Sequence, residues 1–315
     1  MLRLFSGNQP LVLLLGVPMM ALYFLFHDWF GEPVSEQLDL GLWGSYDLKI
    51  TFPLIHWLAV IILFLNASLL ARFFNSNIFF EKNTFLAALF YLVFCSFFES
   101  YYQLGAILFS QTFLILTLTQ LFRLEYNKDG RGSTFNTGFL LGLTLSLDPR
   151  TILLWPLLYL MVTRIRPFVL RESIIMTIGL IVPLIYVAIF QWYMYGGIIL
   201  PKLDQTVGTQ NHYFVLTLAL YLIILLITAL SVRDRMTKSS IRFRKNMHVL
   251  NLYLVFSLTL GVLPWVFFQQ SEGFIFFVIY LALVAPFAEL NPRVRWLFPF
   301  SFYLLLVLSF IRFFI

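Results

Sequence analysis

The residues of this sequence best suited to chemistry are acidic side chains that follow its first long apolar segment. Four of them lie close together in the chain: Asp28, Glu32, Glu36 and Asp39. A carboxylate at this place can act as the general base that takes a proton from an acceptor hydroxyl group. His27 precedes Asp28 and is predicted to orient its carboxylate. The alternative interpretation is a solvated acidic loop, the usual role of such a segment.

A second candidate is the triplet Asp148-Pro149-Arg150, which separates two apolar segments. Asp followed by Pro predicts a helix start, because the carboxylate accepts the first free amide hydrogens and proline has none to lose. The Arg150 guanidinium has the geometry to bind a phosphate or carboxylate with two hydrogen bonds. The alternative for Arg150 is an ion pair with Asp148 or with an acid of the first loop.

Three further polar residues are candidates for substrate binding. Glu99, in the stretch "FFESYYQ", ends an apolar segment beside polar and aromatic residues that could line a cavity. Lys202 and His212 belong to a loop that begins with two glycines and could move as a lid. The alternatives are interfacial placement for Glu99 and a surface position for His212. The sequence has no cluster with metal-ligand spacing, and no cofactor is expected.

The elements that must position these residues are transmembrane helices. The chain has 315 residues, of which 60% are hydrophobic and only 11% are charged, whereas soluble domains carry about 25% charged residues. Segments of the length that crosses a bilayer recur along the whole chain: 9–27, 52–72, 83–99, 104–123, 134–147, 150–164, 173–193, 213–232, 249–269, 273–290 and 296–313.

These segments predict an all-α polytopic bundle that forms one integral membrane domain, residues 1–315. Residues 134–147 and 150–164 are short for a full crossing, so they could instead form a re-entrant hairpin. The prediction is therefore nine to eleven spans. The first segment has no small-residue cleavage site, which predicts an uncleaved span rather than a removed signal peptide.

The distribution of charge predicts the orientation. Numbered from the N-terminus, the even loops between segments hold sixteen Lys and Arg residues, and the odd loops hold only Lys49, Arg150 and Lys202. Nine of the fifteen acids fall on the odd side, together with the candidate site residues. Because cytoplasmic loops are enriched in Lys and Arg, we expect a multi-pass membrane protein with a cytoplasmic N-terminus and an extracytoplasmic acidic face.

Two resemblances follow from particular stretches. The segment "NTGFLLGLTLSLDPRTILLWPLLYLMVTRIRP" resembles part of the multi-pass GT-C class of sugar transferases. This resemblance implies a GT-C-like arrangement of helices, a polyprenyl-linked sugar donor, a catalytic acid in the first outer loop and Arg150 near the donor phosphate. The whole chain, through "MLRLFSGNQP", "QTFLILTLTQLFRL" and "YMYGG", is similar to a multi-pass inner-membrane family of Bacteroidota, a domain of unknown function.

The leading functional expectation is an envelope-biogenesis protein that transfers a sugar from a polyprenyl-phosphate carrier on the extracytoplasmic face. The first alternative is a non-catalytic scaffold or partner subunit of an envelope assembly or secretion complex, which would bind another membrane protein. A transporter is the second alternative, although no chain of intramembrane carboxylates and no inverted repeat favours it. Membrane lipid is an expected partner, and nucleic acid is not, because no basic run alternates with aromatic residues on a polar background.

Overall fold

The computed structural model describes residues 1–31, 37–47, 52–125, 130–198, 212–292 and 296–314. In these residues the chain is almost entirely helical, and its only strands form one short hairpin. The α-helices are α1 (Leu2–Phe5), α2 (Gly16–Phe30), α3 (Phe52–Ser76), α4 (Leu86–Cys95), α5 (Ala106–Arg123), α6 (Arg131–Leu147), α7 (Leu154–Ile165), α8 (Leu170–Tyr195), α9 (His212–Lys238), α10 (Ile241–Phe268), α11 (Ile275–Leu290) and α12 (Leu297–Ile311).

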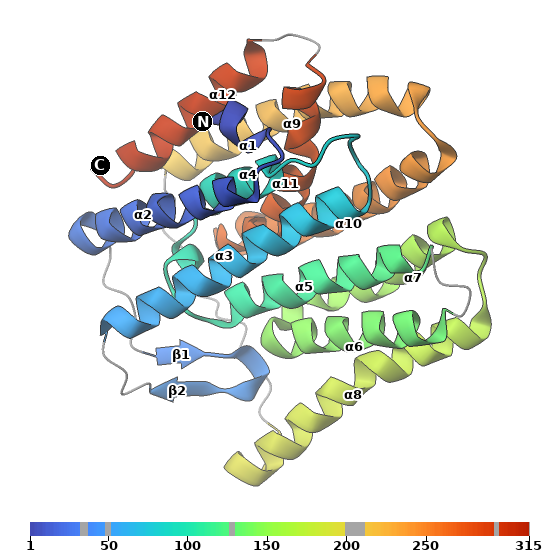
Figure 1. Ribbon diagram of the computed structural model, residues 1–315. Helices are drawn as coiled ribbons and strands as arrows, with labels where there is room; N and C mark the ends of the chain where they lie inside the picture. The colour runs from blue at the N-terminus through green and yellow to red at the C-terminus, as the bar shows by residue number, and fades with distance from the viewer. Residues whose placement is uncertain (32–36, 48–51, 126–129, 199–211, 293–295, 315) are drawn as a thin grey trace.

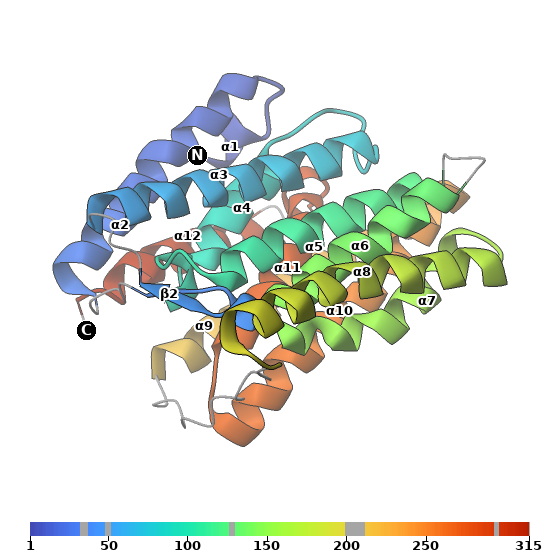
Figure 2. The ribbon, with the colours of Figure 1, turned by 90° about the horizontal axis from the view of Figure 1, so that it is seen from below.

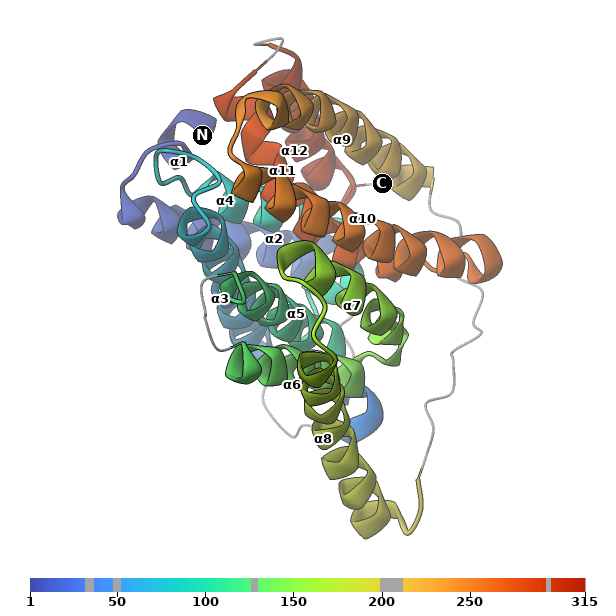
Figure 3. The ribbon, with the colours of Figure 1, turned by 90° about the vertical axis from the view of Figure 1, so that its right-hand side faces the viewer.

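Each of the eleven segments predicted from hydropathy coincides with a helix, which confirms the all-α class. Within the described residues, seven helical segments are long and apolar enough to cross a membrane. α4 and α12 are apolar but shorter, and α6 and α7 have 17 and 12 residues. The number of complete crossings therefore stays a prediction. The helices run roughly side by side (Figure 1), and α8 extends beyond the others at its C-terminal end (Figure 3).

α4 and α11 form the centre of the bundle and pack against each other. Both are apolar on every side and are buried over nearly their whole length, as expected for helices enclosed by others. Buried polar groups bond between helices here: Tyr91 donates to Gln111 Oε1 at 2.5 Å, and Gln111 Nε2 donates to the Ile275 carbonyl at 3.1 Å. Asn66 Nδ2 lies 3.3 Å from the Tyr91 hydroxyl. These bonds tie α3, α4, α5 and α11 together.

α6 packs closely against α8, on the side of the bundle away from α12 (Figure 2). Small residues make this approach possible. A side chain on Gly138 would meet the Met176 carbonyl oxygen at 2.0 Å, and one on Gly142 would meet the Leu180 carbonyl oxygen at 2.4 Å. Leu180 and Met176 belong to α8, so the two glycines set the distance between the two helices.

The helix ends gather into two differently charged ends of the bundle. The acidic end holds Asp28, Glu99, Asp148 and Glu272, and the basic end holds the last turns of α3, α5, α7 and α9. The residues between the predicted spans 213–232 and 249–269 include the basic run from Arg233 to Lys245, and most of this run is helical. α9 continues to Lys238 and α10 begins at Ile241, with the Ser240 hydroxyl accepting from the Phe243 amide. Arg and Lys are good helix formers, so the helices extend past their apolar parts.

A β-hairpin, β1 (Gln37–Asp39) and β2 (Ser45–Asp47), occupies part of the first acidic loop. Its turn contains Gly41 and Gly44, which have φ angles of +64° and +96° that disfavour other residues. The hairpin is fixed to the bundle because Trp43 Nε1 donates to Ser146 Oγ of α6, and Gln191 Nε2 of α8 donates to the Leu42 carbonyl. It lies beside the acidic ends of α5 and α6.

Candidate functional site at the acidic end

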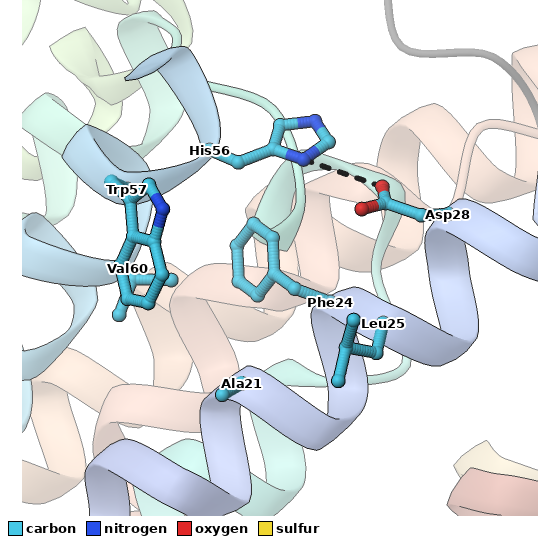
Figure 4. Close-up of a pocket in the computed structure, with 7 residues that line it drawn as sticks. All are labelled: Ala21, Phe24, Leu25, Asp28, His56, Trp57 and Val60. Atoms are coloured by element: carbon cyan, nitrogen blue, oxygen red, sulfur yellow. Dashed lines mark ion pairs between the residues drawn. The ribbon is translucent and has the colours of Figure 1, made fainter. Parts of the chain in front are cut away.

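Asp28 and His56 form an ion pair at the rim of a groove between α2 and α3 (Figure 4). His56 Nδ1 lies 3.3 Å from Asp28 Oδ1. The groove is about 280 Å³ in volume, and apart from this pair its lining is mainly apolar: Ala21, Phe24, Leu25, Trp57 and Val60. Leu25 and Trp57 are also exposed on the outside of the bundle. The groove therefore joins a polar pair to an apolar, exposed surface of the bundle.

Helix geometry explains this lining. Ala21, Phe24, Leu25 and Asp28 are spaced i, i+3, i+4 and i+7 along α2, so they share one face. His56 follows the start of α3, and its side chain is only 9% exposed. A carboxylate and an imidazole from two helices therefore meet at the end of an apolar strip.

The predicted orientation of Asp28 by His27 is wrong. His27 points to a different face of α2 from its neighbour, because consecutive helical residues are about 100° apart. Its ring stacks on Tyr102 at 4.2 Å between ring centroids, and its Nε2 lies 3.1 Å from Glu99 Oε2. His56 is the histidine that contacts Asp28.

Glu99 links four chain segments at the acidic end. Besides His27, its carboxylate binds Arg312, whose Nη2 lies 3.3 Å from Oε1. The Glu99 amide donates to Glu272 Oε1 at 3.2 Å, and the Ser100 hydroxyl donates to the other oxygen of Glu272. Partial burial raises the pKa of Glu99, but the hydrogen bond from His27 and the charge of Arg312 outweigh it, so the pKa is lowered. The Glu99 carboxylate is therefore held in place by His27 and Arg312 at the acidic end.

Asp148 and Arg150 of the Asp148-Pro149-Arg150 triplet form an ion pair at the start of a 3₁₀ turn, η4 (Pro149–Leu153). Asp148 accepts from the Arg150 amide, which confirms the predicted capping role. Arg150 Nε and Nη2 also donate to the two Asp148 oxygens, both at 2.8 Å. Burial lowers the pKa of Arg150, but the nearby charges of Asp148 and Glu272 and the hydrogen bonds with Asp148 raise it overall. The ion pair with Asp148, which is the alternative given above for Arg150, is therefore present.

The remaining candidate residues lie either in other parts of the structure or outside the residues that it describes. Asp39 lies in β1, is exposed, and its Oδ1 accepts from the Gly41 amide at 2.9 Å, a turn contact. Glu32, Glu36 and Lys202 lie outside the described residues. His212 begins α9, and its side chain is outside the description. The structure thus brings Glu99 near Glu272, and Arg150 close enough to Glu272 for their charges to interact.

Two residues of the acidic end were not predicted from the sequence. His56 looks like one polar residue inside an apolar segment, and Arg312 like a charge near the C-terminus. The signal for both was their position at the outer ends of predicted spans, where polar side chains from neighbouring helices meet. No group of three or more His, Cys, Asp or Glu side chains suited to a metal occurs within the described ranges.

Chemically, the Asp28–His56 pair can accept and hold a proton, since a carboxylate and an imidazole share one contact. Glu99 instead links chain segments through His27, Arg312 and Glu272, and Arg150 pairs locally with Asp148. Compared with known proteins, this chain matches no family model, no curated protein and no solved structure.

Proposed function

We propose that this protein is a membrane-embedded transferase that moves a group, a sugar in the first instance, from a lipid-linked donor to a hydroxyl acceptor. The observation that supports the proposal is the Asp28–His56 pair at the end of the α2–α3 groove. The lipid chain lies along the apolar lining, which places its head group beside the pair. A substrate with one apolar part and one reactive polar part fits this arrangement.

In the proposed step, Asp28 accepts the proton of the acceptor hydroxyl group as that oxygen attacks the anomeric carbon of the donor sugar. The bond from this carbon to the donor phosphate oxygen breaks, and the phosphate leaves with the electron pair. His56 orients the Asp28 carboxylate through its Nδ1 contact. The role of Arg150 on a donor phosphate stays a prediction, because Asp148 already accepts from two of its nitrogens.

The test uses purified protein in liposomes with a radiolabelled polyprenyl-phosphate hexose, and membranes of the source cells as acceptor. Asp28→Asn should reduce label transfer at least a hundredfold, the range for loss of a general base. His56→Gln should cause a smaller loss. Asp39→Asn is the matched control at the same end and should transfer label like the unaltered protein. Full activity of a normally folded Asp28→Asn protein would contradict the proposal.

A second candidate function is a non-catalytic partner subunit in envelope assembly. A groove of about 290 Å³ between the hairpin, α5 and α6 favours it, because its lining is almost wholly apolar: Leu38, Leu40, Trp43, Phe109, Phe113, Leu143, Ser146 and Leu147. Such a strip suits an apolar helix of another membrane protein. Purification from native membranes in mild detergent tests it: a stoichiometric partner lost on Phe113→Asp supports the subunit, and bound polyprenyl lipid supports the transferase.

A further inference from the structure

At the basic end, α3 and α5 form a pocket of about 210 Å³ that the transferase proposal does not use. α3 contributes one helical face, with residues spaced i, i+3, i+4 and i+7: Leu69, Arg72, Phe73 and Ser76. Leu69 lies nearer the middle of the bundle, and Arg72 and Ser76 lie in the last two turns. The α3 wall therefore changes from apolar to cationic toward the end of the helix.

α5 repeats the same spacing and the same order. Its wall consists of Leu116, Thr119, Gln120 and Arg123. α3 and α5 pack against each other, and both run from the acidic end to the basic end. Two arginines from neighbouring parallel helices therefore border one pocket whose deeper wall is apolar.

Neither arginine is neutralised within the part of the chain that the structure describes. Other cations of this end have partners: Arg242 Nε lies 3.0 Å from Glu125 Oε2, and Arg235 lies 3.8 Å above the centre of the Phe80 ring. Arg72 and Arg123 have no hydrogen bond or ion pair with a described residue. Their charges are available to a ligand.

The donors that face the pocket are suited to an anion. The Ser76 and Thr119 hydroxyls donate to carbonyls of their own helices, at 3.2 and 2.8 Å. Asn77 also lines the pocket, and its Nδ2 donates to the Phe73 carbonyl at 2.8 Å. The donors without such a bond are the two guanidinium groups and the Gln120 amide. Each helix C-terminus carries about half a negative charge, so two full positive charges outweigh both ends. Guanidinium groups bind phosphate oxygens with paired hydrogen bonds.

We propose that this pocket binds a phosphate group, with Arg72 and Arg123 as its ligands. The volume of the pocket is several times the roughly 30 Å³ that one water molecule occupies. A phosphate group therefore fits. The phosphate belongs to an anionic phospholipid or to a small soluble phosphate compound. Leu69, Phe73 and Leu116 lie beside the arginines, where an acyl chain attached to the phosphate would run.

The experiment measures thermal stabilisation of delipidated protein in a neutral detergent. The probes are dioleoyl phosphatidylglycerol, dioleoyl phosphatidylcholine and inorganic phosphate. An Arg72→Gln/Arg123→Gln protein is compared with an Arg164→Gln/Arg244→Gln protein, which loses the same charge from exposed arginines that do not line the pocket. Arg72→Lys/Arg123→Lys keeps the charge and removes the paired geometry.

We expect an anionic probe to stabilise the unaltered and the control proteins, and the apparent Kd to weaken about tenfold or more in Arg72→Gln/Arg123→Gln. The Lys variant should bind with intermediate affinity. An effect of phosphatidylglycerol alone assigns the site to a lipid, and an effect of inorganic phosphate as well assigns it to the phosphate group itself. Equal stabilisation of both Gln proteins, or none of the unaltered protein by either anion, would overturn the proposal.

Discussion

Charged side chains have different partners at the acidic and the basic end of the bundle. At the acidic end, Asp28, Asp39, Glu99, Asp148 and Glu272 each contact a partner within the protein. At the basic end, Arg72 and Arg123 border a pocket without a described partner. Charges that the protein itself pairs contribute to its stability, because removing one partner leaves the other desolvated. Charges left unpaired add little to folding and remain available to bind something else.

The largest expected effect concerns which side of the membrane each end faces. In Cys-substituted proteins, Ile198→Cys beyond the end of α8 at the acidic end and Lys238→Cys at the basic end should react with an impermeant maleimide from opposite sides. Ile198 is 62% exposed, and the native Cys95 is buried and should stay unlabelled. The excess of Lys and Arg predicts that Lys238→Cys is labelled only from the cytoplasm. Labelling of both cysteines from one side would contradict the assignment of the two ends to opposite sides of the membrane.

The next effect is on stability at the acidic end. Arg150→Ala should lower the free energy of unfolding by about 3 kcal/mol, because it leaves the 4% exposed Asp148 carboxylate without its cation. Arg150→Lys keeps the charge and should cost clearly less. Thermal unfolding in detergent, followed by circular dichroism, measures both. If Arg150→Ala unfolds like the unaltered protein, the Asp148–Arg150 pair does not stabilise the fold.

A smaller effect should appear as a dependence on pH. Because the folded pKa of Glu99 is lowered, its contribution to stability is present above its ordinary pKa of about 4.3 and is lost as the pH falls through the folded value. The side chain is 51% exposed, so solvent screens the contribution. Melting temperatures should therefore fall less below pH 4 in Glu99→Gln than in the unaltered protein. Parallel pH curves would contradict the role given to Glu99.

The smallest effect is expected at the basic end. Without anionic lipid, Arg72→Gln/Arg123→Gln should change the free energy of unfolding by less than about 0.5 kcal/mol, as for exposed residues without partners. The same melts used for Arg150→Ala give this value. A loss as large as that of Arg150→Ala would mean that the basic end depends on its charges for folding as much as the acidic end does.

The sequence alone determined the helices and the distribution of charge. Eleven apolar segments predicted eleven helical positions, because helices of this length are the way a chain satisfies its backbone hydrogen bonds in a membrane. The capping role of Asp148 was also predictable, since it depends only on the next two residues.

Only the tertiary structure decided which charges meet. Helices that are apolar all round carry no periodic signal for their inward face, so nothing in the sequence turned His27 toward Glu99 or brought His56 to Asp28. Arg312 reaches Glu99 from the far end of the chain. These contacts depend on how the helices pack around the buried centre of α4 and α11, which α2, α3 and α12 contact.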